Sequence, residues 1–269
     1  MITYVLYLGQ VPYGTANELQ GTLLSLRKQG RIENTLLLLE HLPVITLGRN
    51  SRVDNVLASP EFLAQRGVEL FEIDRGGDVT FHGPGQLIAY PIFDLRSFNP
   101  NIGAVEYVRR LEEVLIRICG DYGIQTQRVR GLTGVWTYGR AQKPEAKIAA
   151  IGVHISRAVT THGFALNVTT DLDFFSFIVP CGISDKPVTS IERETGNRPA
   201  LEEVAISASR NFGRVFNSQM LWLESLNDLL SSANSTKLPS PQGVPLNEDI
   251  SARPPKELRE LLEDGTELA

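Results

Sequence analysis

The segment from Arg75 to Gln86 is the part of the chain densest in groups that could do chemistry; it reads Arg-Gly-Gly-Asp-Val-Thr-Phe-His-Gly-Pro-Gly-Gln. Four glycines and a proline within twelve residues indicate a backbone that adopts positive φ or is pressed against another group. The segment is not a P-loop, because no Gly-Lys-Ser/Thr follows, and it lacks the glycine spacing of a dinucleotide fingerprint. Two interpretations stay open: a ligand loop that carries Arg75 and His82, or tight turns around a short strand over residues 78–81.

Two further residues could supply a nucleophile and a cation. Cys181 lies between a proline and a glycine, where a loop end can present its thiol to a ligand, although a free cysteine is more often a small buried hydrophobe. Cys119 follows Ile118 at the end of a predicted helix, and we assign it to packing. Lys147 opens an apolar run, where a lysine either extends its ammonium to solvent or places it beside a thiol. A neighbouring ammonium would lower the pKa of a thiol from about 8.5 and could move protons.

The chain contains four histidines. His162 is followed by Gly163 and by a predicted strand that ends in Asn167, and this combination favours the wall of a pocket. His154 lies on a predicted strand and His41 stands before Leu-Pro, so we interpret the first as structural and the second as a turn residue.

Composition restricts the class of protein before any fold is considered. Of 269 residues, 42% are apolar and 21% are charged, which is typical of a globular chain. The net charge of −5 argues against nonspecific binding to nucleic acid or to an anionic membrane. Two cysteines are too few for a disulfide framework, and the cysteines and histidines lack the spacing of a structural zinc site. No signal peptide or membrane span is evident, so we expect a cytoplasmic protein.

The elements that must position these residues follow from periodicity. Alternation and β-rich composition predict the strands 2–8, 35–40, 44–48, 68–73, 87–95, 131–138, 147–155 and 163–168. Helical spacing predicts helices over 13–28, about 60–67, 103–120 and about 201–230, the last of them broken near Gly213. On the third of these, Val105, Val108 and Leu111 belong to the apolar stripe and Glu112 lies outside it. Strands and helices mix without regular βαβ alternation, which favours an α+β fold with a mixed sheet.

The composition changes after Ser232. The last 37 residues hold five of the fifteen prolines and no aromatic residue, with seven acidic against four basic side chains. Such a segment cannot bury enough apolar surface to offset the entropy of ordering it. We therefore expect one folded domain over residues 1–232 and a flexible acidic, proline-rich tail over residues 233–269, in which residues 254–262 could form a short helix.

Taken together and in their order along the chain, these segments resemble the octanoyltransferases of lipoate biosynthesis. The matching motifs are EHLPVITLGR (40–49), RGGDVTFHGPGQL (75–87), KIAAIGVH (147–154), HGFALN (162–167) and PCG (180–182). The resemblance covers about residues 2–220 and leaves the tail outside it. The departures from the family pattern, such as Leu42 and Asp78, do not touch the residues that would carry the chemistry.

The resemblance implies a function and a set of site residues. An octanoyl or lipoyl group would pass from acyl carrier protein to a lysine of lipoyl domains, as a thioester on Cys181, while Lys147 would lower the thiol pKa and relay protons. The fold would be the single-domain mixed sheet of biotin and lipoate protein ligases, with residues 1–232 as its catalytic domain. The substrate-binding residues would be Arg75, Gly76, Gly77, Asp78, Val79, Thr80, Phe81, His82, Ala150, Ile151, Gly152, Gly163, Phe164 and Ala165.

The same resemblance implies the partners. The donor would be octanoyl-acyl carrier protein, and the acceptors would be the lipoyl domains of 2-oxoacid dehydrogenases and the glycine cleavage H protein. It implies a monomer with no metal, no other cofactor, no nucleic acid and no membrane partner. Because acyl carrier protein is acidic, a basic patch should receive it. The candidates are Arg109, Arg110, Arg117, Arg128 and Arg130, of which the first three could equally form a solvated helix face.

Three other functions remain open at this point. An ATP-dependent lipoate or biotin ligase would need an adenylate site and no cysteine nucleophile. A thiol hydrolase would release free octanoate if water outcompeted the lysine acceptor. A binding module without activity would have no chemical need for Lys147 and Cys181.

Overall fold

The computed structural model describes residues 1–51, 53–139, 144–179 and 186–234. The α-helices in these ranges are α1 (Tyr13–Lys28), α2 (Pro60–Gln65), α3 (Ala104–Asp121), α4 (Ile191–Thr195), α5 (Leu201–Phe216) and α6 (Leu226–Asn234). The strands are β1 (Ile2–Val11), β2 (Asn34–His41), β3 (Val44–Leu47), β4 (Glu69–Glu72), β5 (Val79–His82), β6 (Gln86–Ile92), β7 (Thr126–Val129), β8 (Leu132–Thr137), β9 (Lys147–Ser156), β10 (Val159–Asn167) and β11 (Gln219–Trp222). The 3₁₀ helices are η1 (Val53–Asn55), η2 (Leu95–Ser97) and η3 (Leu172–Phe177).

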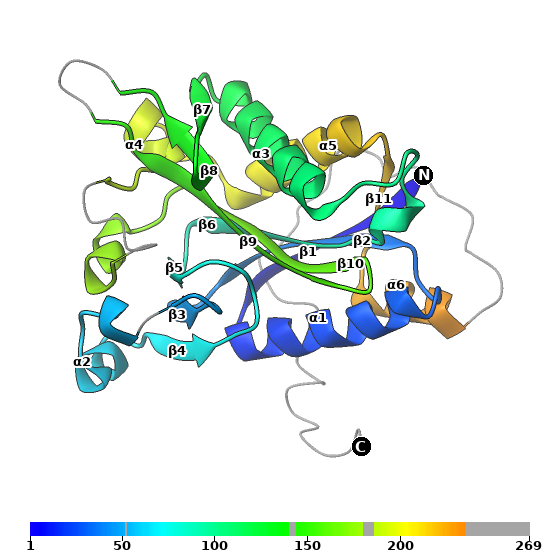
Figure 1. Cartoon of the computed structure of the whole chain (residues 1–269), viewed down its shortest axis with the longest axis horizontal. Helices are drawn as coiled ribbons and strands as arrows, with labels where there is room; N and C mark the ends of the chain where they lie inside the picture. The colour runs from blue at the N-terminus through cyan, green and yellow to red at the C-terminus, as the bar shows by residue number, and fades with distance from the viewer. Residues whose placement is uncertain (52, 140–143, 180–185, 235–269) are drawn as a thin grey trace.

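A large mixed sheet runs through the middle of the molecule (Figure 1). Within the described ranges it has eight strands in the order β11-β1-β2-β6-β10-β9-β8-β7. The pairs β11–β1 and β1–β2 are parallel, and the pairs from β2 to β7 are antiparallel. The mixed sheet predicted from the irregular order of strands and helices is confirmed.

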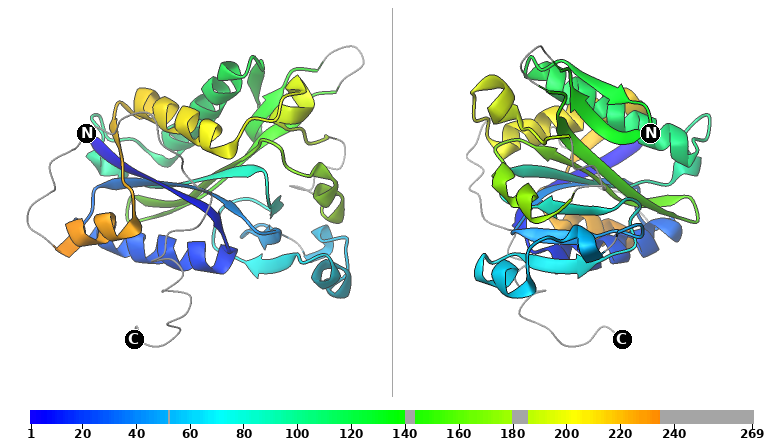
Figure 2. Two further views of the ribbon diagram at one scale, coloured as in Figure 1. Left: turned by 180° about the vertical axis from the view of Figure 1, so that it is seen from behind. Right: turned by 60° about the vertical axis from the view of Figure 1, so that its left-hand side comes forward.

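Helices cover both faces of this sheet. Helices α3 and α5 lie on one face and α1 and α6 on the other, as the two views of Figure 2 show. Strand β2 explains why both faces are covered: Leu36 and Leu38 belong to the core under α3 and α5, while Leu37 and Leu39 belong to the core over α1. Because side chains alternate along a strand, an unbroken leucine run is buried on both faces.

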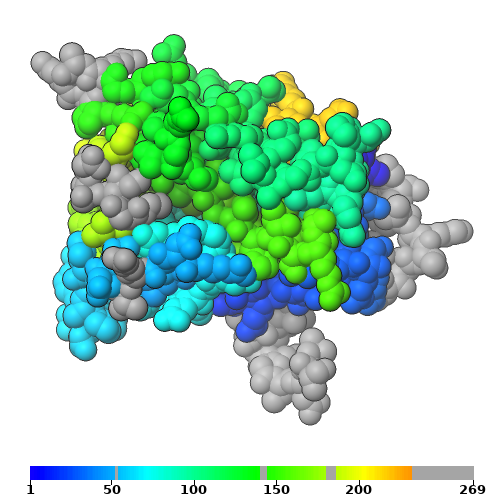
Figure 3. Space-filling view, viewed as in Figure 1, coloured from blue at the N-terminus to red at the C-terminus, as the bar shows by residue number. Residues whose placement is uncertain are grey.

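A second, smaller sheet packs beside the first. It has the order β4-β3-β5, with β3 parallel to β4 and antiparallel to β5. Its own core joins Ile45, Val79 and Phe81 to Leu63 of α2 and to the phenylalanines of η3. In the space-filling view the blue and cyan surface of α1 and this sheet adjoins the light green surface of the β9–β10 hairpin (Figure 3). The site lies where these segments meet.

The predicted late helix over residues 201–230 is wrong in its second half. Helix α5 ends at Asn217, which adopts left-handed φ of 50°, and the chain then forms β11 and α6. Strand β11 pairs in parallel with β1, from Ile2 to Val5. Strands β1 and β11 are far apart in the sequence, so the helical periodicity of residues 201–230 could not reveal their pairing. Strand β7 and helix α4, both shorter than six residues, were also missed.

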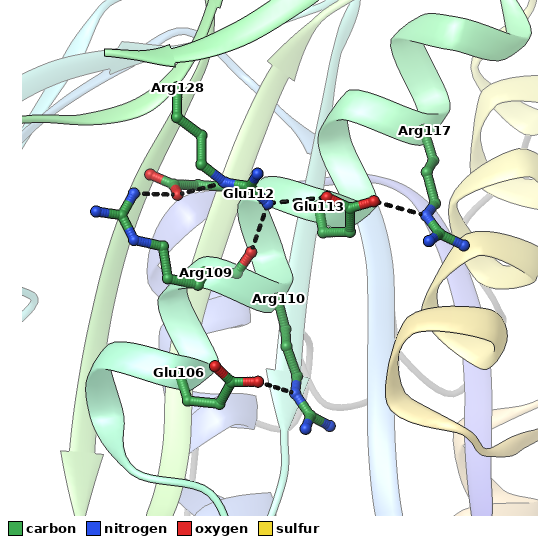
Figure 4. A network of polar contacts seen from close by, with 7 residues as sticks. All are labelled: Glu106, Arg109, Arg110, Glu112, Glu113, Arg117 and Arg128. Atoms are coloured by element: carbon green, nitrogen blue, oxygen red, sulfur yellow. Dashed lines mark hydrogen bonds and ion pairs between the residues drawn. The ribbon is translucent and has the colours of Figure 1, made fainter. Parts of the chain in front are cut away.

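The predicted apolar stripe of α3 is also partly wrong. Val105 is 76% exposed, whereas Tyr107 and Leu111 are fully buried. Glu112, expected outside the stripe, is 1% exposed because Arg109 and Arg128 clamp its carboxylate at 2.7 and 3.1 Å (Figure 4). A carboxylate is buried at low cost only when cations and hydrogen bonds compensate it.

Most of the arginines proposed as a docking patch form ion pairs with the glutamates of this network. Arg110 pairs with Glu106 and Arg117 pairs with Glu113, each one turn away on α3 (Figure 4). Arg128 contacts Glu113 as well as Glu112, while Arg130 is exposed. A network of four arginines and three glutamates presents little net positive charge, which favours the solvated-face interpretation.

No helix within the described part of the chain is long and apolar enough to cross a membrane. The tail from residue 235 onward, including the short helix suggested over 254–262, lies outside the described residues, and so does Cys181.

Candidate active site

A cavity of about 530 Å³ opens between the small sheet and the β9–β10 hairpin. This volume lies within the range of about 300–1,000 Å³ that is usual for small-molecule sites. Its wall contains Lys147 and every predicted substrate-binding residue except Phe81. The wall residues among those predictions are Arg75, Gly76, Gly77, Asp78, Val79, Thr80, His82, Ala150, Ile151, Gly152, Gly163, Phe164 and Ala165.

Phe81 instead points away from this cavity into the core of the small sheet. It is 1% exposed and stacks on Phe174 of η3 with a centroid distance of 4.7 Å. Neighbouring residues of a strand face opposite sides, so His82 can line the cavity only if Phe81 turns inward. Phe81 therefore packs behind the wall and is not itself one of the wall residues.

Glycines of two neighbouring segments leave the space that the Arg75 side chain fills. The Arg75 guanidinium is buried and donates to the Thr46 carbonyl at 3.0 Å and to its hydroxyl at 2.8 Å. A Cβ at Gly152 would lie 2.8 Å from Arg75 Cδ, and a Cβ at Gly48 would lie 2.8 Å from its Nη1. The two interpretations of the segment are therefore compatible: turns flank the short strand β5, and the same turns line a cavity.

A chain of side-chain hydrogen bonds runs along the cavity wall from His82. His82 Nδ1 lies 2.8 Å from Gln86 Oε1, and Gln86 Nε2 donates to Asn167 Oδ1 at 2.9 Å. Asn167 Nδ2 donates in turn to the Thr189 carbonyl at 2.9 Å. Burial lowers the pKa of His82 to about 3, with the nearby His41 and Arg75 acting in the same direction. His82 is therefore a neutral side chain at physiological pH.

His41 lies behind this wall as a buried partner of the cavity residue Tyr90. Its Nδ1 lies 2.7 Å from the Val11 carbonyl, and its Nε2 lies 2.8 Å from the Tyr90 hydroxyl. Burial lowers the pKa of His41 to about 4, although the bond to Val11 opposes this shift. The interpretation of His41 as a turn residue is wrong, since it ends β2 and lies in the core.

The Asp74 carboxylate contacts two histidines, one of which lines the cavity. His162, which lines the wall, lies 3.0 Å from Asp74, and His154 lies 3.5 Å from the same carboxylate. Burial lowers the pKa of His162 despite its bond to Asp74. Partial burial opposes ionisation of Asp74, but the histidines and Arg49 outweigh it and keep the pKa of Asp74 below its usual value. The prediction of His162 as a pocket residue is confirmed by its place in the wall.

Lys147 enters the wall at the start of β9. Its Nζ lies 4.9 Å from the ring centroid of Trp136, and Lys186 Nζ lies 5.2 Å from the same ring. The Lys147 backbone donates to the Pro187 carbonyl and accepts from the Thr189 amide, each at 2.9 Å. Cation–π contacts and a strand position hold the ammonium at a defined point of the cavity.

Cys119 has the role expected for it. It is fully buried in the core under α3, and burial raises the pKa of its thiol to about 12. A thiol with so high a pKa does not form a nucleophilic thiolate near neutral pH.

Comparisons with known proteins assign the chain to a family. Residues 12–213 match the family model of the lipoyl protein ligase A/B catalytic domain. The chain is 66% identical over 264 residues to an octanoyltransferase of Koribacter versatilis, a match that covers 98% of each chain. The chain belongs to the octanoyltransferase family. It is also 63% identical to the octanoyltransferase of Acidobacterium capsulatum, over 86% of this chain and 96% of the relative. The match with the first relative extends into the segment after residue 232, beyond the expected limit of the resemblance.

Solved structures place this octanoyltransferase in the expected fold. The bipartite lipoate protein ligase of Thermoplasma acidophilum superposes with a TM-score of 0.66 at 17% identity, over 87% of this chain and 91% of that one. A lipoate-protein ligase A bound with ATP gives a TM-score of 0.62 at 14% identity, over 87% and 93%. At these identities the likeness concerns the fold alone, and it confirms the fold expected from the motifs.

Sequence reasoning missed several residues of the octanoyltransferase cavity. Tyr13 from the first turn of α1, Tyr90 and Gln86 line the wall. The Tyr13 hydroxyl is buried and has no hydrogen-bond partner among the described residues. Gln86 lies within the quoted motif 75–87, so its place was visible there, and Asn167, predicted as part of a pocket wall, lines the cavity. Tyr13 and Tyr90 lie in ordinary helix and strand patterns that carry no such signal.

Proposed function

We propose that this chain transfers an octanoyl group from acyl carrier protein to a lysine of lipoyl domains, through a thioester on Cys181. The observation that carries the proposal is the 66% identity to a named octanoyltransferase over nearly the whole of both chains. The enzyme is an acyltransferase of lipoate biosynthesis. The cavity supports this reading because its wall joins Lys147 to the glycine-rich segment around Arg75.

The reaction divides into two displacements. The Cys181 thiolate attacks the thioester carbonyl of the donor, and the carrier leaves as a thiol after it takes up a proton. The lysine amine of the lipoyl domain then attacks the new thioester, the C–S bond breaks, and an amide forms. A covalent intermediate splits one difficult encounter into two easier ones. The ammonium of Lys147 would stabilise the thiolate and supply the proton for the leaving group.

The acyl chain would lie against the small residues of β9 and β10. Gly152 faces Gly163 and Ala150 faces Ala165 in the antiparallel register, and these four residues line the cavity. Arg75 packs over Gly152 and the Ala89 carbonyl packs over Gly163, so the room for an alkyl chain along the hairpin lies beside Ala150 and Ala165. At about 0.8 kcal/mol per methylene, burial of an octanoyl chain would contribute roughly 5 kcal/mol to binding.

The same proposal covers the donor, the acceptors, the oligomeric state and the location of the enzyme. The donor is octanoyl-acyl carrier protein, and the acceptors are the lipoyl domains of 2-oxoacid dehydrogenases and the glycine cleavage H protein. The enzyme acts as a monomer in the cytoplasm. The roles of Cys181, Lys147 and the wall residues rest on their motifs and on the cavity that collects the described ones.

The proposal is tested by the intact mass of the protein after brief incubation with octanoyl-acyl carrier protein in the absence of ATP. We expect a gain of one octanoyl unit, mapped to Cys181 by peptide analysis and lost on addition of a lipoyl domain. Absence of the adduct, combined with labelling of the lipoyl domain from free octanoate and ATP, would instead support a ligase. Release of free octanoate without acceptor labelling would support a hydrolase.

Replacing Lys147 by alanine is expected to move the pH profile of Cys181 alkylation by iodoacetamide to higher pH. The reason is that a thiolate loses its neighbouring cation. Lys186→Ala is the matched control, because Lys186 contacts the same Trp136 ring but pairs with Glu145. An unchanged alkylation profile in Lys147→Ala, or an equal shift in the control, would remove Lys147 from this role.

A further inference from the structure

The hydrogen-bond chain from Thr189 to His82 sets the protonation pattern of the histidine ring. The Thr189 carbonyl can only accept, so the Asn167 amide must present its NH₂ there and its oxygen to Gln86. The Gln86 NH₂ therefore faces Asn167, and it also faces the Phe81 carbonyl at 3.3 Å. The Gln86 oxygen is left for His82 at 2.8 Å, which requires His82 to carry its proton on Nδ1.

His82 consequently offers a lone pair on Nε2. The side chain lines the cavity and is 8% exposed, and among the described residues Nε2 makes no hydrogen bond. Burial and the nearby His41 and Arg75 lower the pKa of the ring to about 3, so Nε2 stays unprotonated at the pH of the cell. An acceptor that opens on a cavity and has no partner among the described residues points to a ligand that brings a donor.

The chemistry of the proposed reaction limits what that donor can be. Once the octanoyl group is on Cys181, its thioester has a carbonyl oxygen and an alkyl chain but no N–H group. The attacking lysine amine has two N–H bonds when it is neutral, and one of them survives in the product amide. An acceptor that holds this N–H would direct the nitrogen lone pair at the thioester carbonyl.

The hydrogen bonds that run from Thr189 to His82 also connect to the strand of Lys147, which fits a role in orienting the amine. The Thr189 amide donates to the Lys147 carbonyl at 2.9 Å, and the Thr189 carbonyl is the group on which the His82 tautomer depends. His82 and Lys147 line the same cavity. The acceptor on His82 is therefore tied by continuous hydrogen bonds to the strand that carries the lysine.

We propose that His82 Nε2 accepts a hydrogen bond from the lysine amine of the lipoyl domain and so orients it for attack on the octanoyl thioester. The inference rests on the proposed function. As the C–N bond forms, the C–S bond breaks and its electron pair stays on the Cys181 sulfur. One amine proton passes to that thiolate, and the other stays on the nitrogen, bound to His82. Gln86 and Asn167 are positioning residues that act through the His82 tautomer.

Octanoylation of Cys181 and release of the octanoyl group, measured separately, distinguish this role of His82 from a structural role or contact with the donor. In His82→Asn the side-chain amide replaces Nδ1–H toward Gln86 but offers no acceptor in place of Nε2. We expect Cys181 to be octanoylated by octanoyl-acyl carrier protein within about threefold of the normal rate. Release to a lipoyl-domain lysine should fall at least about 10²-fold, the lower end for assisted proton-transfer steps. Release to dithiothreitol, which has no N–H group, should be nearly unchanged.

The controls keep the outcomes distinct. His154→Asn is the matched control, because His154 contacts Asp74 and Arg49 and is not in the cavity wall, so both half-reactions should be unaffected. An equal loss of release to amine and thiol, or a loss of octanoylation in His82→Asn, would overturn the inference and indicate a structural role or contact with the donor arm. Absence of octanoylation in the unmodified enzyme would instead overturn the proposed function.

A measurement on the unmodified protein does not depend on the folding of any variant. Nitrogen-15 NMR of the histidine rings reports which nitrogen carries the proton. We expect His82 in the neutral Nδ1–H form throughout pH 6 to 8. A ring protonated on Nε2 would have no acceptor for the amine and would overturn the inference.

Discussion

We expect the replacement of Cys181 by alanine to lower octanoyl transfer at least about 10⁴-fold and to leave the fold intact. Loss of a catalytic nucleophile removes the covalent route altogether, and losses of about 10⁴- to 10⁶-fold accompany removal of such groups elsewhere. The measurement is single-turnover transfer from octanoyl-acyl carrier protein to a lipoyl domain, with circular dichroism as the test of folding.

The second cysteine of the chain is the matched control for that experiment. Cys119 is buried in the core, and burial raises the pKa of its thiol to about 12. Cys119→Ala should keep at least about a third of the normal transfer rate, with a loss of stability from the lost packing. Normal turnover in Cys181→Ala, or transfer that depends on Cys119, would contradict the covalent mechanism.

Acidification from pH 7 to pH 5 is expected to lower the free energy of unfolding by roughly 4 kcal/mol through two buried histidines. Burial lowers the pKa of His41 to about 4 and that of His82 to about 3. In the unfolded chain both rings return to about 6.5 and take up protons. Between pH 6.5 and 4 the unfolded state therefore binds more protons than the folded state, so stability falls as the pH falls.

The measurement is the urea midpoint at several pH values between 7 and 5. Glu40 acts in the opposite sense over part of this range, because burial raises the pKa of its carboxyl, so the histidine contribution is isolated by substitution. His41→Asn keeps a donor for the Val11 carbonyl and removes one titrating ring, so it should reduce the pH dependence by about half, whatever its stability at pH 7. Equal midpoints at pH 7 and 5 would contradict the prediction.

Several features of the enzyme could be derived from the sequence alone. The leucine run of residues 35–40 predicted a strand, and the structure buries it on both faces because alternation places successive side chains on opposite sides. The motif order identified the family, and the glycine-rich segment identified one side of the cavity wall. These properties are local: short stretches of residue types determine them, and no knowledge of distant neighbours is needed.

Other features depend on contacts between residues far apart in the chain. Strand β11 forms because its backbone pairs with the edge of β1. Glu112 is buried because Arg128 of β7 forms an ion pair with it. The helical pattern of each segment is the same with or without such partners. Secondary-structure and burial predictions failed at these places for that reason.

The same distinction applies to the site: some of its features follow from the sequence and others only from the tertiary structure. The sequence by itself determined that Cys181, Lys147 and the Arg75 segment occur in the order typical of one family of acyltransferases. Only the tertiary structure decided that Phe81 turns away from the cavity, that Tyr13 enters it, and that one backbone carbonyl directs the proton of His82. The physical reason is that a cavity and a tautomer depend on distance and direction in space, which the order of residues along a chain does not specify.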